Sequence, residues 1–335
     1  MSPNPLRHAL SRMGGRDPHE DHRAATPLEL FFDLTFVIAV GVAGSQFAHE
    51  IAEAHVVPGL LAFAFAMFAV IWAWINFTWF ASAYDTDDWV FRVVTMVQIV
   101  GVLILTMGIE PMFHSVVEGH HVDNRVIVAG YVLMRLALVA QWIRASRQDP
   151  ARRETCLRYA RYLAVVQLGW IAVLIVETDV AVTFLLVVPL IALEMATPYA
   201  AERKARTPWH AHHIAERYGL LAIIALGECL IGAIETLRAI VANHGWSIDA
   251  ALVGFGGTAL ASGCGGFTSC SPPDGHSTFA GTAPTSSAMA ISPSSRPSRP
   301  PGPDYTWRRT TSTTRPTSAQ LQPWLPSLSR WHFSS

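Results

Sequence analysis

The sequence predicts an all-α membrane protein, a polytopic transmembrane helical bundle with seven secure spans and an incomplete eighth. The chain has 335 residues, of which 51% are hydrophobic and only 15% charged, whereas soluble proteins carry about 25% charged residues. The apolar residues also come in long uninterrupted blocks rather than in alternation. Seven of these blocks have about the 17–25 residues that a helix needs to cross the hydrocarbon core of a bilayer.

The expected helices follow one another along most of the chain. Pro27 suits a first helical turn, and Thr26 before it suits an N-cap. Trp142, Trp209 and Trp246 lie near expected helix ends, as in the aromatic belts at membrane interfaces. The approximate bounds of the eight helices are 28–48, 58–83, 89–113, 124–143, 159–176, 180–199, 212–238 and 247–260.

The charges of the connecting segments predict the orientation. Basic residues gather before the first helix, after the fourth and after the sixth, while the opposite turns are acidic or rich in histidine. Because cytoplasmic loops of membrane proteins carry the excess of Lys and Arg, we expect a multi-pass protein of the bacterial inner (plasma) membrane with a cytoplasmic N-terminus. Residues 1–25 would form a solvated polar tail, and residues 26–260 the transmembrane helical domain.

The composition changes abruptly at about residue 261. Residues 261–335 contain no Val, Glu or Lys and are rich in Ser, Pro, Thr and Arg. One interpretation is a low-complexity, disordered tail. We favour a second, a frame-shifted C-terminus, because the break falls within a helix that needs more apolar residues to cross the membrane.

Several functional classes are disfavoured. The chain holds a single lysine, and its arginines are scattered over loops, so no nucleic-acid partner is expected. The four cysteines lack zinc spacing, and the sequence offers no recognisable nucleophile and base, so we expect no metal, no cofactor and no enzyme activity. The expected partners are the lipid bilayer and an unknown small solute or ion, and a homo-oligomer stays open.

Two acidic residues stand at the start of the first helix. Glu29 and Asp33 are four residues apart, so they share one helix face. A carboxylate that faces lipid is costly, and such groups normally turn inward to a partner. We therefore expect this face to pack against another charged helix.

The seventh helix supplies candidates for that partner. It enters the membrane from the same side as the first helix, which places His213, Glu216 and Arg217 level with Glu29 and Asp33. We expect Arg217 to pair with Asp33 or Glu29. These five residues would form either a cytoplasmic gate or a cluster that only locks two helices together, since buried ion pairs also serve that purpose.

Other ionisable residues fall within the expected spans. Glu228 lies near the middle of the membrane, where an ionisable group suggests a functional site, and it is our candidate for proton binding during transport. The alternative is a protonated side chain that hydrogen-bonds to a neighbouring helix. Arg135 has no assigned partner, Glu110 being one candidate, and Glu194 is expected at an interface because it lies near a helix end.

The two charged stretches resemble motifs of the bacterial low temperature requirement A family. They are Thr-Pro-Leu-Glu-Leu-Phe-Phe-Asp-Leu at residues 26–34, His-x-x-Glu-Arg-x-Gly-Leu at residues 213–220, and Leu-Gly-Glu at residues 226–228. The resemblance covers about residues 25–260, and the sequence departs from the family pattern after Gly257, where family members continue with an aromatic-rich helix and further spans. It implies a polytopic inner-membrane protein named for a growth phenotype in the cold, with no agreed substrate.

The leading functional hypothesis is transport of a small solute or ion, with proton linkage through Glu228. The alternative is a non-transporting membrane scaffold or sensor whose buried charges only fix helix packing. A membrane-embedded enzyme ranks last.

Overall fold

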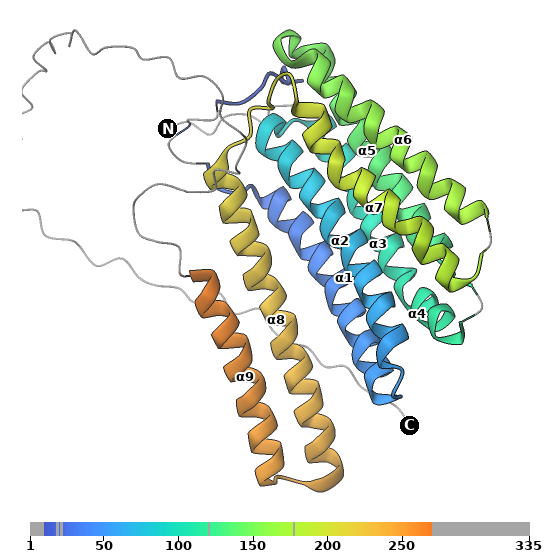
Figure 1. Cartoon of the computed structure of the whole chain (residues 1–335). Helices are drawn as coiled ribbons and strands as arrows, with labels where there is room; N and C mark the ends of the chain where they lie inside the picture. The colour runs from blue at the N-terminus through green and yellow to red at the C-terminus, as the bar shows by residue number, and fades with distance from the viewer. Residues whose placement is uncertain (1–9, 18–19, 21–22, 120, 177, 270–335) are drawn as a thin grey trace, which may run out of the picture. The chain divides into compact units, whose positions relative to one another are not determined.

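The computed structural model describes residues 10–17, 20, 23–119, 121–176 and 178–269, and this part of the chain folds into nine α-helices and one short 3-10 helix without a strand (Figure 1). The helices are α1 (Pro27–Ala52), α2 (Val56–Tyr84), α3 (Trp89–Met107), α4 (Ile109–Glu118), α5 (Arg125–Gln148), α6 (Arg153–Ile175), α7 (Val180–Glu202), α8 (Ala211–His244) and α9 (Ile248–Ser269), and η1 (Pro150–Arg152) is the 3-10 helix. The predicted all-α fold is confirmed.

Seven helical segments of the described chain are long and apolar enough to cross a membrane, and a shorter apolar stretch, Ala250–Cys264, forms most of α9. This agrees with the prediction of seven spans and an incomplete eighth. One span is divided, because α3 ends and α4 begins around Gly108. A Cβ atom at Gly108 would come within 2.6 Å of the backbone nitrogen of Ile127, so glycine allows this break to lie directly against the start of α5.

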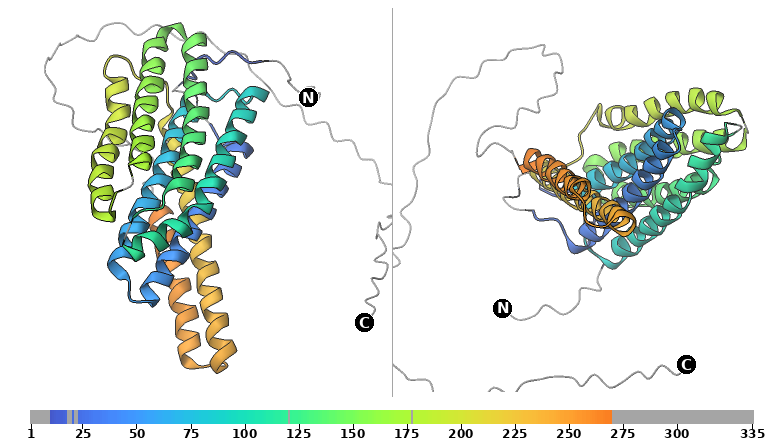
Figure 2. Two further views of the ribbon diagram at one scale, coloured as in Figure 1. Left: turned by 90° about the vertical axis from the view of Figure 1, so that its right-hand side faces the viewer. Right: turned by 90° about the horizontal axis from the view of Figure 1, so that it is seen from below.

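Helix α2 lies at the centre of the bundle. It packs against α1, α4, α5 and α8, while α3, α5, α6 and α7 pack in succession on one side. Helix α8 packs against α1, and α9 packs against α8 to form a hairpin with it (Figure 2). Apolar side chains such as Leu185 and Val188 of α7 are exposed, as expected for a surface that faces lipid.

The segment before α1 corrects the expectation of a solvated tail. The Met13 side chain is fully buried, the backbone nitrogen of Ser11 donates to Asp88 at 3.2 Å, and that of Arg16 donates to the carbonyl of Ala83 at 3.1 Å. Residues 11–16 therefore cover one end of the bundle, because Met13 is apolar and the backbone groups find partners there.

Two further differences concern the last helices. Helix α8 has 34 residues and extends past the predicted end near Arg238, and α9 continues to Ser269 instead of ending near residue 260. The predicted change of character at residue 261 therefore falls inside a helix. The expectations for residues 270–335 lie outside the described residues.

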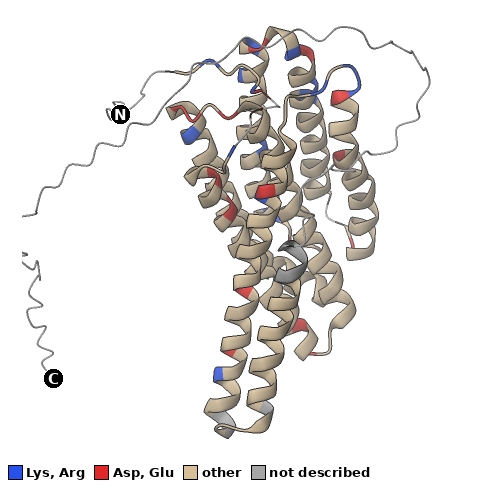
Figure 3. Cartoon of the chain, turned by 90° about the vertical axis from the view of Figure 1, so that its left-hand side faces the viewer, with Lys and Arg blue, Asp and Glu red and all other residues tan. Residues whose placement is uncertain are grey.

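Most of the basic residues lie at the end of the bundle where α1 begins (Figure 3). The same end holds the α5–α6 and α7–α8 connections, since successive helices alternate in direction. The arrangement agrees with the charge pattern from which the orientation was predicted, and the orientation itself stays a prediction.

Candidate functional site

Glu29 has a local role at the start of α1. The side chain of Thr26 accepts a hydrogen bond from the Glu29 nitrogen at 3.3 Å, and the Glu29 carboxylate accepts one from the Thr26 nitrogen at 2.8 Å. This reciprocal pair is a capping box, which satisfies two backbone donors that the helix cannot. The Thr-x-x-Glu spacing of the sequence is the signature of this motif, and it was not used in the prediction.

Asp33 lies one turn further along the same face and is fully buried. Its Oδ1 atom accepts a hydrogen bond from the Arg217 guanidinium of α8 and another, at 2.6 Å, from the indole nitrogen of Trp74 on α2. The Arg217 guanidinium also lies 5.6 Å from the centres of the Trp74 and Phe77 rings. One carboxylate thus joins three helices, and the predicted proximity of Arg217 to Asp33 is observed.

His213 connects Glu29 to the start of α8. The Nε2 atom of His213 lies 3.4 Å from a Glu29 carboxylate oxygen, and the Arg217 guanidinium lies 3.6 Å from the other oxygen. Helix α8 begins here because the ring of His210, its N-cap residue, accepts a hydrogen bond from the His213 nitrogen at 3.2 Å. The cap fixes the first turn of α8, and with it the direction in which His213 and Arg217 point.

Arg23 and Asp85 complete the group and were missed by the sequence analysis. The Arg23 guanidinium donates to the carbonyls of Ala81 and Ser82 at the end of α2. It also lies 3.8 Å from Glu29 and 3.7 Å from Asp85. Only the placement of Arg23 shortly before the first helix hinted at such a role, and nothing in the sequence pointed to Asp85.

We refer to these six residues as the charge cluster: Arg23, Glu29, Asp33, Asp85, His213 and Arg217. Each is at most 6% exposed, and four of them are fully buried. Two guanidinium groups face three carboxylates, which leaves one excess negative charge when all three carboxylates are ionised and the histidine is neutral. Because an excess charge is costly in a buried site, the cluster favours uptake of one proton.

The remaining predicted residues lie outside the cluster. Glu216 is partly exposed on another face of α8, so the structure does not bring it together with its neighbours Arg217 and His213. Glu228 lies midway along α8 and is partly buried against α1. A Cβ atom at Gly41 of α1 would come within 2.9 Å of Glu228 Oε2, so the missing side chain of Gly41 makes the space that this carboxylate occupies.

Residues 24–264 match the family described as bacterial low temperature requirement A protein (LtrA), and this match covers more than two thirds of the chain. The chain belongs to the LtrA family. The match continues past Gly257, after which the sequence was expected to depart from the family pattern. With its seven apolar spans, this LtrA family member is an integral membrane protein.

An uncharacterized protein of Rhizobium meliloti is 24% identical to this LtrA chain over 225 residues. The aligned region is 64% of the chain and 52% of the relative, so the chain spans about half the length of that relative. No solved structure matches the chain.

The LtrA fold holds a second buried ion pair, on the side of the bundle away from the charge cluster. Arg135 of α5 and Glu194 of α7, each 3% exposed, are 2.7 Å apart. Glu194 also accepts hydrogen bonds from the Tyr131 hydroxyl at 2.7 Å and from the Trp170 indole at 2.9 Å. The suggested pairing of Arg135 with Glu110 and the interfacial position of Glu194 are therefore wrong.

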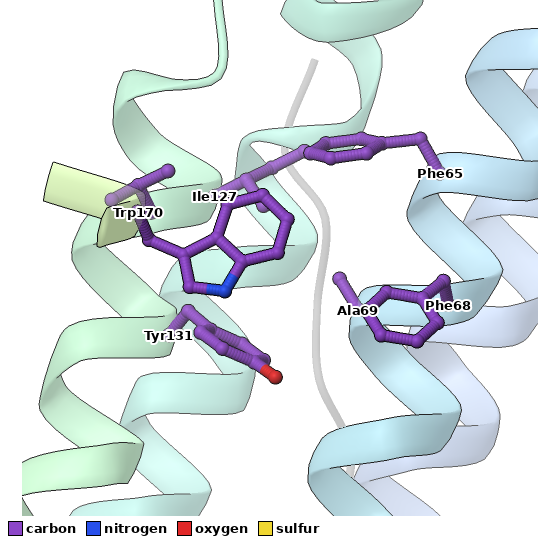
Figure 4. Close-up of a pocket in the computed structure, with 7 residues that line it drawn as sticks. Phe65, Phe68, Ala69, Ile127, Tyr131 and Trp170 are labelled. Carbon is purple, nitrogen blue, oxygen red and sulfur yellow. The ribbon is translucent and has the colours of Figure 1, made fainter. Parts of the chain in front are cut away.

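The rings of Tyr131 and Trp170, which donate to Glu194, also line a small apolar pocket between α2, α5 and α6 (Figure 4). Tyr131 and Trp170 lie on one side of it, and Phe65 and Phe68 of α2 lie on the other. The pocket offers no charged group to a ligand, and its lining explains why Tyr131 and Trp170 direct their polar atoms to Glu194 instead.

Asp85 is expected to make the stability of the protein depend on pH. Burial, followed by the negative charge of Glu29, raises the pKa of Asp85 from 3.8 to about 6. The folded state therefore favours the protonated acid. The resulting contribution of Asp85 to the free energy of unfolding is complete below about pH 3.8 and is lost as the pH rises through about 6. Because each unit between the two pKa values is worth about 1.4 kcal/mol, Asp85→Asn should gain up to about 3 kcal/mol over the wild type between about pH 4 and pH 7.

Thermal unfolding of detergent-solubilised protein, followed by tryptophan fluorescence across this pH range, measures the difference. Asp179→Asn is the matched control, since the Asp179 side chain is exposed and makes no capping hydrogen bond at the start of α7. If the unfolding temperature of Asp85→Asn changes with pH in the same way as that of the wild type, the raised pKa of Asp85 is contradicted.

Proposed function

We propose that this protein moves a small solute or ion across the bacterial inner membrane in a proton-linked cycle, with Glu228 as the group that binds and releases the proton. The observation that carries the proposal is the placement of this carboxylate midway along a long apolar helix. It is partly buried against Gly41, and no hydrogen bond or ion pair joins it to another residue of the described chain. An ionisable group in such a place is retained at a cost that function explains best.

The charge cluster also supports the proposal, because it lies where α8 begins, on the same α1–α8 contact that holds Glu228 further along. Arg217 and Glu228 are eleven residues apart on α8, which corresponds to about three turns. The cluster binds the start of α8 to α1 and α2 through Arg217 and His213. We assign it the role of a cytoplasmic lock, which holds one end of the α1–α8 contact closed while Glu228 exchanges its proton.

A second candidate function is a membrane scaffold or sensor that transports nothing. The observation that favours it is the structural use of the acids: Glu29 closes the capping box of α1, and Asp33 is shared between Trp74 and Arg217. Such groups would fix helix packing whether or not a solute passes.

Proton flux into liposomes that contain the purified protein distinguishes the two candidates. A pH-sensitive dye inside the liposomes reports proton entry after acidification outside, with and without a low-molecular-mass extract of bacterial cytoplasm that supplies the unidentified solute. We expect Glu228→Gln to lower the initial rate at least tenfold. Gly41→Val should have a similar effect, because its side chain would displace the Glu228 carboxylate.

Glu235→Gln is the matched control on the same helix. Its side chain is 62% exposed and pairs with Arg238, so its rate should stay within twofold of the wild type. A Glu228→Gln rate equal to that of the control would contradict the role of Glu228. A wild-type rate no higher than that of empty liposomes, with and without the extract, would favour the scaffold.

A further inference from the structure

Two adjoining cavities lie between α2, α6, α7 and α8, at the end of the bundle where α1 begins. The inner one has a volume of about 270 Å³ and the outer one of about 530 Å³. Both are lined by Trp79, Tyr159 and Pro198, so the outer cavity leads to the inner one. Ligand pockets in proteins commonly measure about 300–1,000 Å³.

The inner cavity has aromatic walls. The Trp142 side chain is 3% exposed, and its ring stacks on that of Tyr159 with centres 4.2 Å apart. Trp72 and Tyr218 contribute further walls. The side-chain amide of Asn76 donates to the carbonyl of Trp72 at 2.7 Å, so this polar group is already engaged. The surroundings suit a hydrocarbon chain better than an ion.

The outer cavity carries a positive charge. Glu202 is the acidic residue of its lining, and the Glu202 carboxylate accepts hydrogen bonds from the hydroxyl groups of Tyr159 and Thr207. Arg203 and Arg206 also line it, both are exposed, and neither has a carboxylate partner among the residues that the structure describes. Hydroxyl donors leave the negative charge of Glu202 in place, so two guanidinium groups face one carboxylate at the mouth of an apolar cavity, and the net charge there is positive.

We propose that the two cavities form a binding site for an anionic phospholipid. An acyl chain fills the aromatic inner cavity, and the headgroup phosphate lies between Arg203 and Arg206. Guanidinium groups bind phosphate through paired hydrogen bonds, and basic pockets between transmembrane helices suit anionic headgroups. The site uses neither Glu228 nor the charge cluster, so it does not depend on the function proposed above.

Binding of fluorescent phosphatidylglycerol to the full-length protein in detergent tests the headgroup contact. We expect this lipid to bind at least tenfold more tightly than phosphatidylcholine with the same chains. The double variant Arg203→Gln/Arg206→Gln should lose this preference. The control Arg147→Gln/Arg153→Gln changes the same charge at two exposed positions of the same bundle end and should bind within twofold of the wild type.

A second comparison tests the acyl-chain contact. Ile75→Trp places a large side chain in the lining of the inner cavity, whereas Ile71→Trp lies one turn away on α2 and outside the lining. We expect at least tenfold weaker lipid binding for the first and no more than a twofold change for the second. Ile75→Phe replaces the first variant if thermal unfolding shows that Ile75→Trp does not fold.

Three results would overturn the proposal. Full displacement of the lipid by millimolar inorganic phosphate would assign the site to free phosphate. Equal losses in the two double arginine variants would assign the binding to the general charge of the surface. Unchanged binding in the folded variant at Ile75 would exclude the inner cavity as the place of the acyl chain.

Discussion

Arg217→Leu is expected to lower the free energy of unfolding by about 3–5 kcal/mol, the range measured when one partner of a buried ion pair is removed. The variant leaves Asp33 fully buried without its cation and takes from Glu29 a positive charge 3.6 Å away. Total stabilities of about 5–15 kcal/mol are usual, so a marked fall in the yield of folded protein should accompany the loss. Thermal unfolding in detergent, followed by tryptophan fluorescence, measures it.

A second substitution separates the charge from the packing. Asp33→Asn combined with Arg217→Leu removes both charges of the pair and keeps an oxygen that accepts the hydrogen bond from Trp74. We expect the double variant to regain at least half of the lost stability. Arg147→Leu, at an exposed position of the same bundle end, should change stability by no more than about 0.5 kcal/mol. An Arg217→Leu variant as stable as this control would show that the pair contributes nothing to the fold.

Glu194→Leu should have an effect of similar size, about 3–5 kcal/mol. This change leaves Arg135 buried without an anion and removes the acceptor of the Tyr131 and Trp170 hydrogen bonds. Tyr131 and Trp170 donate to different oxygens of the carboxylate, so Glu194→Gln keeps an acceptor for one of these two neutral donors and should lose less. Comparison of the two variants by thermal unfolding therefore separates the ion pair from the hydrogen bonds.

Glu235→Leu is the control for this pair. The side chain of Arg238 is 71% exposed and that of Glu235 is 62% exposed. Exposed ion pairs of this kind contribute about 0–1 kcal/mol to stability. If Glu194→Leu unfolds at the same temperature as Glu235→Leu, the second buried pair does not stabilise the bundle.

The contact between α1 and α8 could be predicted because two independent constraints converge on it. The alternation of spans places Glu29, Asp33 and Arg217 at one depth, and the cost of an unpaired charge in the membrane requires them to meet. The helical period then selects the face. Glu216 was included wrongly because it shares the depth of Arg217 but not its face.

The other members of the two ion-pair networks could not be predicted. Pairing of Arg135 with Glu194 depends on how α5, α6 and α7 are arranged side by side, and helical periodicity gives a face without naming the neighbour. Trp74 and Asp85 reach the charge cluster through the central position of α2, which follows only from the packing of the whole bundle.

The pairing of Asp33 with Arg217 has a consequence for biosynthesis. The two residues are 184 positions apart, and Arg217 belongs to the seventh apolar span to be made. At about 5–20 residues per second, the ribosome needs roughly 10–40 s after it has incorporated Asp33 before it incorporates Arg217. Five complete spans are made during this interval, and Trp74, which lies on the first of these five, is therefore made well before Arg217.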